Sequence, residues 1–264
     1  MCRLELVQIQ QQDIGLELGN SMLRLHVAKP AQPGPFPGVL FFSDIYQLGE
    51  PILRLVHRLA GYGYVVAAPE IFHRLEPPGT VLTPGGIGRL RGNHDARHTA
   101  VDDFDRDTKA VIDWLMDQPE VQRDKLASMG FCIGGHLTFR AAFDARIRAS
   151  VCCYPTGLHD GVLGDEPTDT LQHCRSITGA VLAIFGSRDP HVPHHAREQI
   201  LTALGTSGLR YHHLMFDADH TFMRDDGPRW DPQASDEAWA ASIGFLDAQL
   251  SGNSSSASSS ASTS

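Results

Sequence analysis

The sequence predicts an α/β fold with a mainly parallel central sheet and helices on both faces of that sheet. Two short, continuous apolar runs, at 38–43 and 64–69, are typical of strands that are buried on both sides. Between them, residues 51–62 repeat apolar side chains at helical spacing, begin at a proline and end beside a glycine. A strand, a helix and a strand in this order predict a parallel pair.

Length and composition bound the class of protein. The chain has 264 residues, of which 42% are hydrophobic and 20% charged, so we expect one α/β domain over 1–250. The Ser-rich stretch 251–264 cannot bury apolar area and is predicted to be a disordered tail. A net charge of −9 without a basic stripe argues against nucleic acid as a partner.

Cysteine usage and hydropathy predict the compartment. The five cysteines include no Cys-x-x-Cys pair and form no even framework, which favours a reducing compartment. The N-terminus has no apolar leader region, and no run of 18 apolar residues occurs. We therefore expect a soluble, cytoplasmic protein with no membrane partner.

The remaining elements follow from periodicity and composition. Alternation at 4–9 and 22–27 predicts an antiparallel pair at the edge of the sheet. Residues 77–100 are rich in Gly, Pro, Arg and His without a clear period, which predicts a long irregular loop. The later part of the chain is predicted to form a helix over 101–116, a strand over 125–131, a helix over 133–143, a strand over 149–154, an irregular segment over 155–178, a strand over 180–186, a helix over 193–204, a strand over 211–216 and a helix over 235–250.

A Gly-x-Cys-x-Gly motif lies where the predicted strand 125–131 meets the following helix. This spacing is typical of a nucleophile elbow, with Cys132 in the position that is usually serine. Gly130 and Gly134 would let strand and helix approach closely, and the helix N-terminus would favour a thiolate. The amide of Ile133 would then donate to an oxyanion. The motif is also compatible with a buried structural cysteine beside a glycine-rich turn.

Three chemically suited side chains follow three predicted strands. Cys132, Asp189 and His220 occur in the order nucleophile, acid and histidine, and function sits at the carboxyl ends of parallel strands. His220 would accept the proton of Cys132, and Asp189 would fix the tautomer of the ring. Taken singly, Asp189 before a proline could be a turn residue, and His220 could be a surface or core histidine. Their joint placement favours a catalytic triad.

The motifs at 130–135, 186–193 and 219–222 resemble those of the dienelactone hydrolase family of α/β-hydrolases. The resemblance covers residues 38–250. It implies the α/β-hydrolase fold, with Cys132 as nucleophile and the other two residues completing the triad. It also implies hydrolysis of a small lactone or ester through an acyl-enzyme, without a cofactor.

The same resemblance suggests roles for three further positions. Asp44 stands where the family has an acidic residue that helps control protonation of the nucleophile, and it could otherwise cap a turn. The amide of Ile45 would be the second oxyanion donor. Arg224 matches an arginine that contacts a substrate carboxylate, although a solvated loop arginine is the alternative. Further anion contacts would come from the segment 77–100, where the sequence does not rank the candidates Arg89, Arg91 and Arg97.

Other functional hypotheses stay open from the sequence. His191, His194 and His195 lie near the predicted acid, but their spacing matches no standard zinc site, so we expect no metal. The substrate could instead be a thioester or an amide. The chain could also be a non-catalytic binding or redox-sensing protein that uses a reactive Cys132. Whether the substrate is anionic is not decided by these residues.

Overall fold

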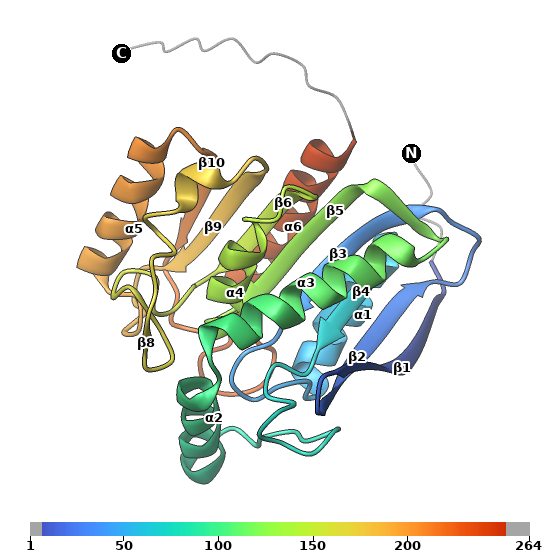
Figure 1. The fold of residues 1–264 in the computed structure, drawn as a ribbon. Coiled ribbons are helices and arrows are strands. Elements are labelled where there is room, and N and C mark those ends of the chain that lie inside the picture. Colours follow the sequence, from blue (N-terminus) through green and yellow to red (C-terminus); the bar gives the residue numbers. More distant parts are fainter. Residues whose placement is uncertain (1–6, 252–264) are drawn as a thin grey trace.

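An eight-stranded sheet forms the centre of the protein, whose computed structural model describes residues 7–251 (Figure 1). Strands β3 to β10 of this sheet pair in parallel, whereas β1 pairs with β2, and β2 with β4, in antiparallel fashion. In spatial order the strands are β1 (Ile9–Leu18), β2 (Ser21–Pro30), β4 (Val65–Pro69), β3 (Phe36–Phe42), β5 (Val121–Phe131), β6 (Ile147–Cys153), β9 (Ala180–Gly186) and β10 (Arg210–Phe216).

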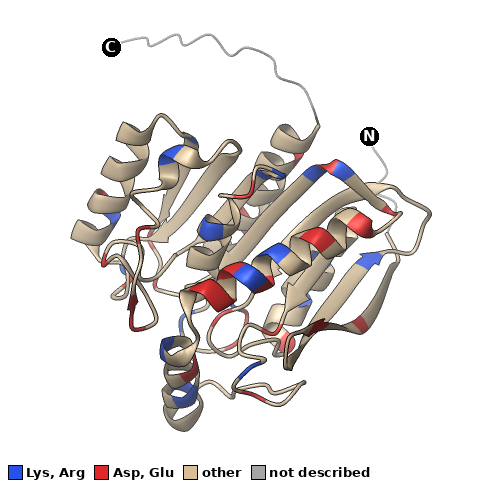
Figure 2. Cartoon of the chain, viewed as in Figure 1, with Lys and Arg blue, Asp and Glu red and all other residues tan. Residues whose placement is uncertain are grey.

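Helices cover both faces of the sheet (Figure 1). Helices α1 (Glu50–Gly61) and α6 (Pro232–Leu250) pack on one face, and α3 (Val101–Asp117), α4 (Ile133–Ala141) and α5 (His194–Ser207) pack on the other. Acidic and basic residues are interspersed along α3, whereas most of the central strands lack charge (Figure 2). Within residues 7–251, no helix combines the length and the apolar character that a bilayer crossing requires.

Alternation along the central strands builds the two halves of the core. Val39 and Phe41 face the layer of α1 and α6, whereas Leu40 and Phe42 face the layer of α3 and α4. All four are at most 2% exposed, which explains why β3 appears in the sequence as a continuous apolar run. Burying side chains of this size contributes roughly 1.5–3 kcal/mol each, so the sheet is a rigid support for whatever follows its strands.

The N-terminal edge of the sheet differs from the prediction. A first strand was expected over 4–9, but β1 runs over Ile9–Leu18, through the segment expected to be a connection; residues 4–6 lie outside the described part. Ile14, Leu16 and Leu18 pack on the core and alternate with the exposed Gly15 and Glu17. The alternation of apolar and exposed residues that is typical of a strand therefore continues beyond the more apolar stretch 4–9 on which the prediction was based.

The prediction of a long irregular loop over 77–100 is also wrong, because helix α2 (Gly86–His98) occupies about half of this segment. This helix buries Gly92, Asp95 and Ala96 rather than a stripe of large apolar side chains, so periodicity gave no signal for it. It begins after Gly85, whose φ of 122° favours glycine. Helix α2 extends away from the sheet at the lower end of Figure 1.

The segment 155–178 is largely irregular, as predicted. It holds only the two-residue strands β7 (Val162–Leu163) and β8 (Glu166–Pro167), and the short 3-10 helix η1 (Cys174–Ser176). The other predicted helices and strands are found with bounds shifted by a few residues. The Ser-rich tail that we predict lies outside the described residues from 252 onward.

Candidate functional site

Cys132 occupies a strained turn between β5 and α4. Its φ of 59° and ψ of −121° are rare for a residue with a side chain. Tight packing enforces the turn, because a Cβ at Gly130 would lie 2.3 Å from the carbonyl oxygen of Gly134. A Cβ at Gly134 would in turn lie 2.2 Å from the carbonyl oxygen of Ser43. The cysteine is therefore held at the tip of the elbow, with its side chain partly exposed.

Asp189 and His220 form a buried hydrogen-bonded pair at two neighbouring strand ends. The ring Nδ1 of His220 donates to Asp189 Oδ2 over 2.7 Å, and the two residues are 3% and 2% exposed. The other carboxylate oxygen accepts from the amides of His191 and Val192, at 2.7 and 3.1 Å. Burial, the largest single effect, raises the pKa of Asp189, but the hydrogen bond and charge of His220, together with the two amide hydrogen bonds, leave the pKa below its ordinary value.

The sulfur of Cys132 interacts with the same ring. Burial lowers the pKa of His220, but the negative charge at Cys132 and the hydrogen bonds to Asp189 and Cys132 raise it to about 9. The ring of His220 therefore carries a proton at neutral pH. The structure thus brings together the three side chains that the sequence singled out.

Asp44 and Arg224, which lie 180 residues apart, form a buried ion pair in the same region. The Asp44 carboxylate also accepts from the Tyr46 amide at 2.8 Å, and burial, which outweighs the nearby Arg224 charge, raises its pKa. Arg224 further binds Asp226 at 2.5 Å and lies over the Tyr46 ring, 4.9 Å from its centroid. Among the described residues, no hydrogen bond joins Asp44 to Cys132, so control of the nucleophile by Asp44 stays a prediction.

Two backbone amides are placed as possible oxyanion donors. Ile133 is the first residue of α4, where N–H groups have no partner inside the helix. Ile45 belongs to the loop after β3, and both residues line the same cavity as Cys132. Helix α2 presses on this loop at a glycine, because a Cβ at Gly92 would lie 2.4 Å from the carbonyl oxygen of Ile45. Gly92 therefore allows this close approach of α2 to the loop, a contact that the sequence did not reveal.

Gly92→Ala is expected to lower kcat about 10-fold with little change in KM, because it displaces the loop that carries the Ile45 amide, and an oxyanion forms only after binding. The measurement is steady-state hydrolysis of an activated aryl ester. Gly244→Ala is the matched control, since Gly244 is also helical and has open space around it. Equal kcat values for the two variants would show that Gly92 does not position the oxyanion loop.

A cavity of about 670 Å³ opens above the strand ends. Helix α2 contributes Arg89, Asn93 and Arg97 to its wall, whereas Arg91 instead binds the buried Glu76. Of the three arginines that the sequence could not rank, the structure thus places two at the cavity. Other lining residues that the sequence did not single out are Tyr46, Thr156, Thr221, Asp226 and Arg229.

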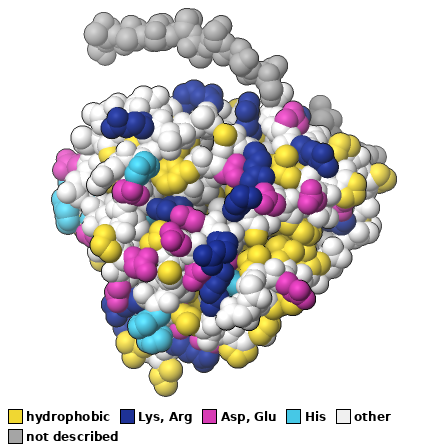
Figure 3. Space-filling model, in the orientation of Figure 1, with side chains coloured by type: hydrophobic (Ala, Val, Ile, Leu, Met, Phe, Trp, Pro, Cys, Tyr) yellow, Lys and Arg dark blue, Asp and Glu magenta, His cyan; other side chains and the backbone are white. Residues whose placement is uncertain are grey.

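Two large apolar side chains of α2 are exposed among its arginine and histidine residues. Ile87 and Leu90 are 86% and 68% exposed, and hydrophobic side chains gather over this helix at the lower tip of the molecule (Figure 3). The inner surface of the helix forms the cavity wall. Helix α2 therefore has one side toward the site and one toward solvent.

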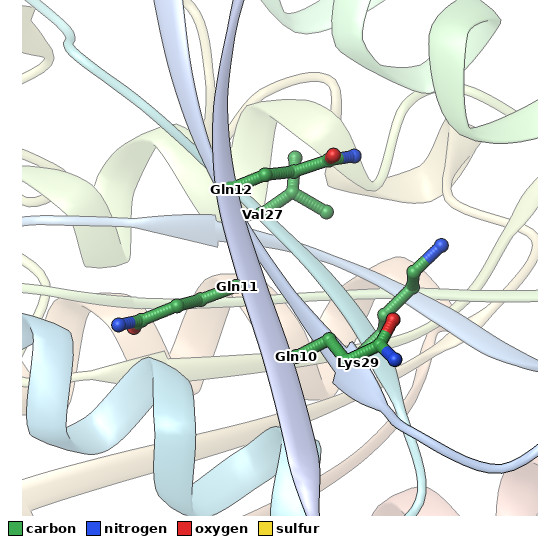
Figure 4. Close-up of a pocket in the computed structure, with 5 residues that line it drawn as sticks. All are labelled: Gln10, Gln11, Gln12, Val27 and Lys29. Carbon is green, nitrogen blue, oxygen red and sulfur yellow. The ribbon is translucent and has the colours of Figure 1, made fainter.

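A second hollow, of about 360 Å³, lies on the edge strands β1 and β2. It is lined by Gln10, Gln11, Gln12, Val27 and Lys29, and the side chains of Gln11 and Gln12 leave the strand in opposite directions (Figure 4). These residues offer amides and one ammonium group but no nucleophile with a base. The chemistry is thus concentrated at the strand ends.

One of the histidines near Asp189, His191, contacts the ring of His220. His191 packs against His220 with ring centroids 4.6 Å apart, and burial, followed by the positive charge of His220, lowers the pKa of His191. Within residues 7–251, no group of three His, Cys, Asp or Glu side chains is arranged to hold a metal ion.

Comparisons with known proteins agree with this arrangement. The profile of the Dienelactone hydrolase family matches residues 23–250. A Saccharomyces cerevisiae protein named "Putative carboxymethylenebutenolidase" is 34% identical over 213 residues, which are 77% of this chain and 78% of that protein. A Synechocystis protein of the same name is 29% identical and covers 83% of this chain and 89% of its own length.

Solved structures share the architecture. A dienelactone hydrolase-type structure from Klebsiella pneumoniae superposes with a TM-score of 0.79 at 21% identity, covering 90% of this chain and 98% of that one. An acylaminoacyl peptidase from Pyrococcus horikoshii superposes with a TM-score of 0.70 at 14% identity, covering 92% of this chain and 42% of that one. At such low identity these likenesses show the fold, and they confirm the α/β-hydrolase fold that the sequence predicts. Together with the family match over 23–250, they show that the chain belongs to the dienelactone hydrolase family.

Proposed function

We propose that this protein hydrolyses small lactones or activated carboxylic esters through an acyl-enzyme on Cys132. One observation carries the proposal: a single buried ring, that of His220, interacts with both the Cys132 sulfur and the Asp189 carboxylate at a cavity. Membership of the family and the names of the curated relatives support the same class of reaction.

The geometry supports a two-step mechanism. The Cys132 thiolate attacks the carbonyl carbon, and the resulting oxyanion accepts from the amides of Ile133 and Ile45. When the carbon–oxygen bond breaks, the His220 imidazolium gives its proton to the departing alkoxide, which in a lactone stays attached to the acyl group. Water then attacks the thioester while His220 takes a proton, and cleavage of the carbon–sulfur bond restores the thiolate and the imidazolium.

A burst experiment tests this function against the alternatives. A p-nitrophenyl ester should give a rapid release of about one equivalent of phenolate per enzyme, followed by slower turnover. A non-catalytic binding or redox-sensing protein would show no continuing turnover, even if its cysteine were acylated once and released one equivalent of phenolate. A thioester or amide hydrolase of the same scaffold would show the burst but would prefer the thioester or the amide over the lactone at equal concentration.

We further propose that Arg224 and the arginines at the cavity favour an anionic substrate. Within residues 7–251, Arg89 and Arg229 line the cavity and form no ion pair, whereas both cavity carboxylates, Asp44 and Asp226, are bound to Arg224. A cavity with unpaired cations in a protein of net charge −9 would attract anions locally.

Arg224→Ala is expected to lower kcat/KM for an acidic lactone about 10-fold more than for a neutral lactone of the same size, because an arginine fork binds carboxylates strongly. The neutral lactone reports any general damage from leaving Asp44 without its partner. Arg91→Ala is the control, since it breaks an equivalent pair with the buried Glu76 outside the cavity. An unchanged preference between the two lactones would remove Arg224 from the substrate site.

A further inference from the structure

The hydroxyl of Thr156 lies next to the nucleophile, on the side of the cavity formed by the segment after β6. Thr156 Oγ1 is 3.9 Å from the Cys132 sulfur, within the range of a hydrogen bond to sulfur. The Thr156 amide donates to the Cys132 carbonyl oxygen over 3.3 Å, so backbone and side chain both contact the same residue. Among the described residues, the hydroxyl has no other partner than this sulfur.

The protonation of the site sets the direction of this hydrogen bond. In the mechanism proposed above, the thiol proton resides on the ring of His220, so the sulfur is an acceptor. A hydroxyl facing a thiolate can only donate to it. Hydrogen bonds to a charged partner are stronger than those between neutral groups, so this contact stabilises the ionised form of the nucleophile.

A fully buried histidine on α4 fixes the position of Thr156. His136 is 0% exposed, and its Nδ1 donates to the Thr156 carbonyl oxygen over 3.0 Å. Its Nε2 then accepts from the Thr170 hydroxyl at 2.9 Å, and that hydroxyl oxygen accepts from Arg140 at 3.0 Å. Burial lowers the pKa of His136 to about 3, so the ring stays neutral and this chain of donors and acceptors keeps one direction.

The residue after Thr156 is tightly packed, which restricts movement of this segment. Gly157 has a φ of 77°, and a Cβ there would lie 2.4 Å from the Val162 carbonyl oxygen and 3.4 Å from His136 Nδ1. The segment thus turns sharply between the buried histidine and the β7 strand. The hydroxyl of Thr156 is consequently presented to the sulfur by a rigid support.

We propose that Thr156 is a catalytic residue that donates a hydrogen bond to the Cys132 thiolate, and that His136 is the positioning residue that holds it there. The inference rests on the proposed function for its catalytic meaning. In the step concerned, the thiol proton passes to the His220 ring, and the Thr156 hydroxyl keeps its own proton while stabilising the sulfur anion. Because no bond to Thr156 is made or broken, its effect is on the fraction of the enzyme that carries the thiolate.

The other ionisable groups whose charges interact with that of Cys132 are His220, Tyr46 and Tyr154. Burial raises the pKa of both tyrosines, so they remain neutral at acidic pH. His191 packs against the ring of His220. None of these groups is changed by a substitution at Thr156. If the rate of Cys132 alkylation falls off at a different acidic pH in such a variant, the cause is therefore the loss of the hydroxyl.

The test is the pH profile of Cys132 alkylation by iodoacetamide in the folded protein, measured without substrate. Thr156→Val, which keeps the shape and removes the hydroxyl, is expected to move the acid limb upward by about one pH unit, which lowers the rate on that limb about 10-fold. Thr156→Ser should keep the wild-type profile. Identical acid limbs for the wild type and Thr156→Val would overturn the proposal.

A double-mutant cycle tests the positioning role. His136→Leu should displace the acid limb as Thr156→Val does, and the combined variant should show no further displacement, because both act through one hydroxyl. His136→Asn, whose amide can still donate to the Thr156 carbonyl, should recover much of the wild-type profile. Additive displacements, or an unchanged profile in a folded His136→Leu, would contradict positioning by this residue.

Failure of this inference and failure of the proposed function are separable. Alkylation requires no turnover, so the Thr156 profile can be obtained even if no ester is hydrolysed. Conversely, if the enzyme hydrolyses esters but Thr156→Val has the wild-type alkylation profile, the proposed function stands and only the proposed role of Thr156 is excluded.

Discussion

Cys132→Ala is expected to lower kcat/KM for an activated ester by about 10³-fold or more, and to abolish the burst of product. The reason is that the sulfur forms the covalent intermediate, and the oxyanion donors and the cavity alone retain only a small part of the rate enhancement. The measurement is stopped-flow release of p-nitrophenolate from the wild type and the variant at equal active concentrations.

The chain offers a matched control for this experiment. Cys174 is also free and is buried against α5, in the core cluster that contains Leu204. Cys174→Ala removes one sulfur atom from the molecule without touching the cavity, so the burst should be retained. A Cys132→Ala variant with wild-type turnover would exclude the acyl-enzyme that we propose.

Asp189→Asn is expected to lower kcat about 10²- to 10⁴-fold while the fold is retained, because an amide at this position favours the wrong tautomer of His220 and no longer stabilises its cation. The carboxylate is among the groups that raise the pKa of His220 to about 9. Its loss should therefore lower that pKa, so that less of the enzyme carries the thiolate and the imidazolium at neutral pH. Steady-state kinetics and NMR titration of the ring measure the two effects.

Asp217→Asn is the control for the acid. Asp217 follows the neighbouring strand β10, but its side chain is 81% exposed and binds Arg188 and Ser187 on the surface. The variant should keep wild-type kcat. If Asp189→Asn were equally active, the buried pair with His220 would be structural rather than catalytic.

Much of the site could be predicted because its parts lie directly after apolar strands. The glycines around Cys132 mark the elbow, and Asp189 and His220 follow strands that a sequence pattern identifies well. In a parallel sheet the carboxyl ends of such strands meet at one edge, so three distant residues could be expected to converge. The family motifs pointed to the same three positions.

The parts that escaped prediction depend on contacts without a sequence period. Helix α2 packs through Gly92 and Ala96 rather than through large apolar residues, so its segment looks irregular. The ion pair between Asp44 and Arg224 joins residues on different loops, and nothing local indicates it. Thr156 lies just beyond the β6 strand end, where the same topological rule could have drawn attention to it, but a lone threonine in an irregular segment is not distinctive.

The central claim is that one sulfur carries the acyl group during turnover. The most direct test lets the enzyme react with a slowly hydrolysed aryl ester and stops the reaction by rapid quenching. The quenched protein is then analysed by intact-protein mass spectrometry and by peptide mapping. The account predicts one acyl group per chain, located on the peptide that contains Cys132 and removed by hydroxylamine. An acyl group on another residue, or full turnover with no acylated protein at any quench time, would contradict it.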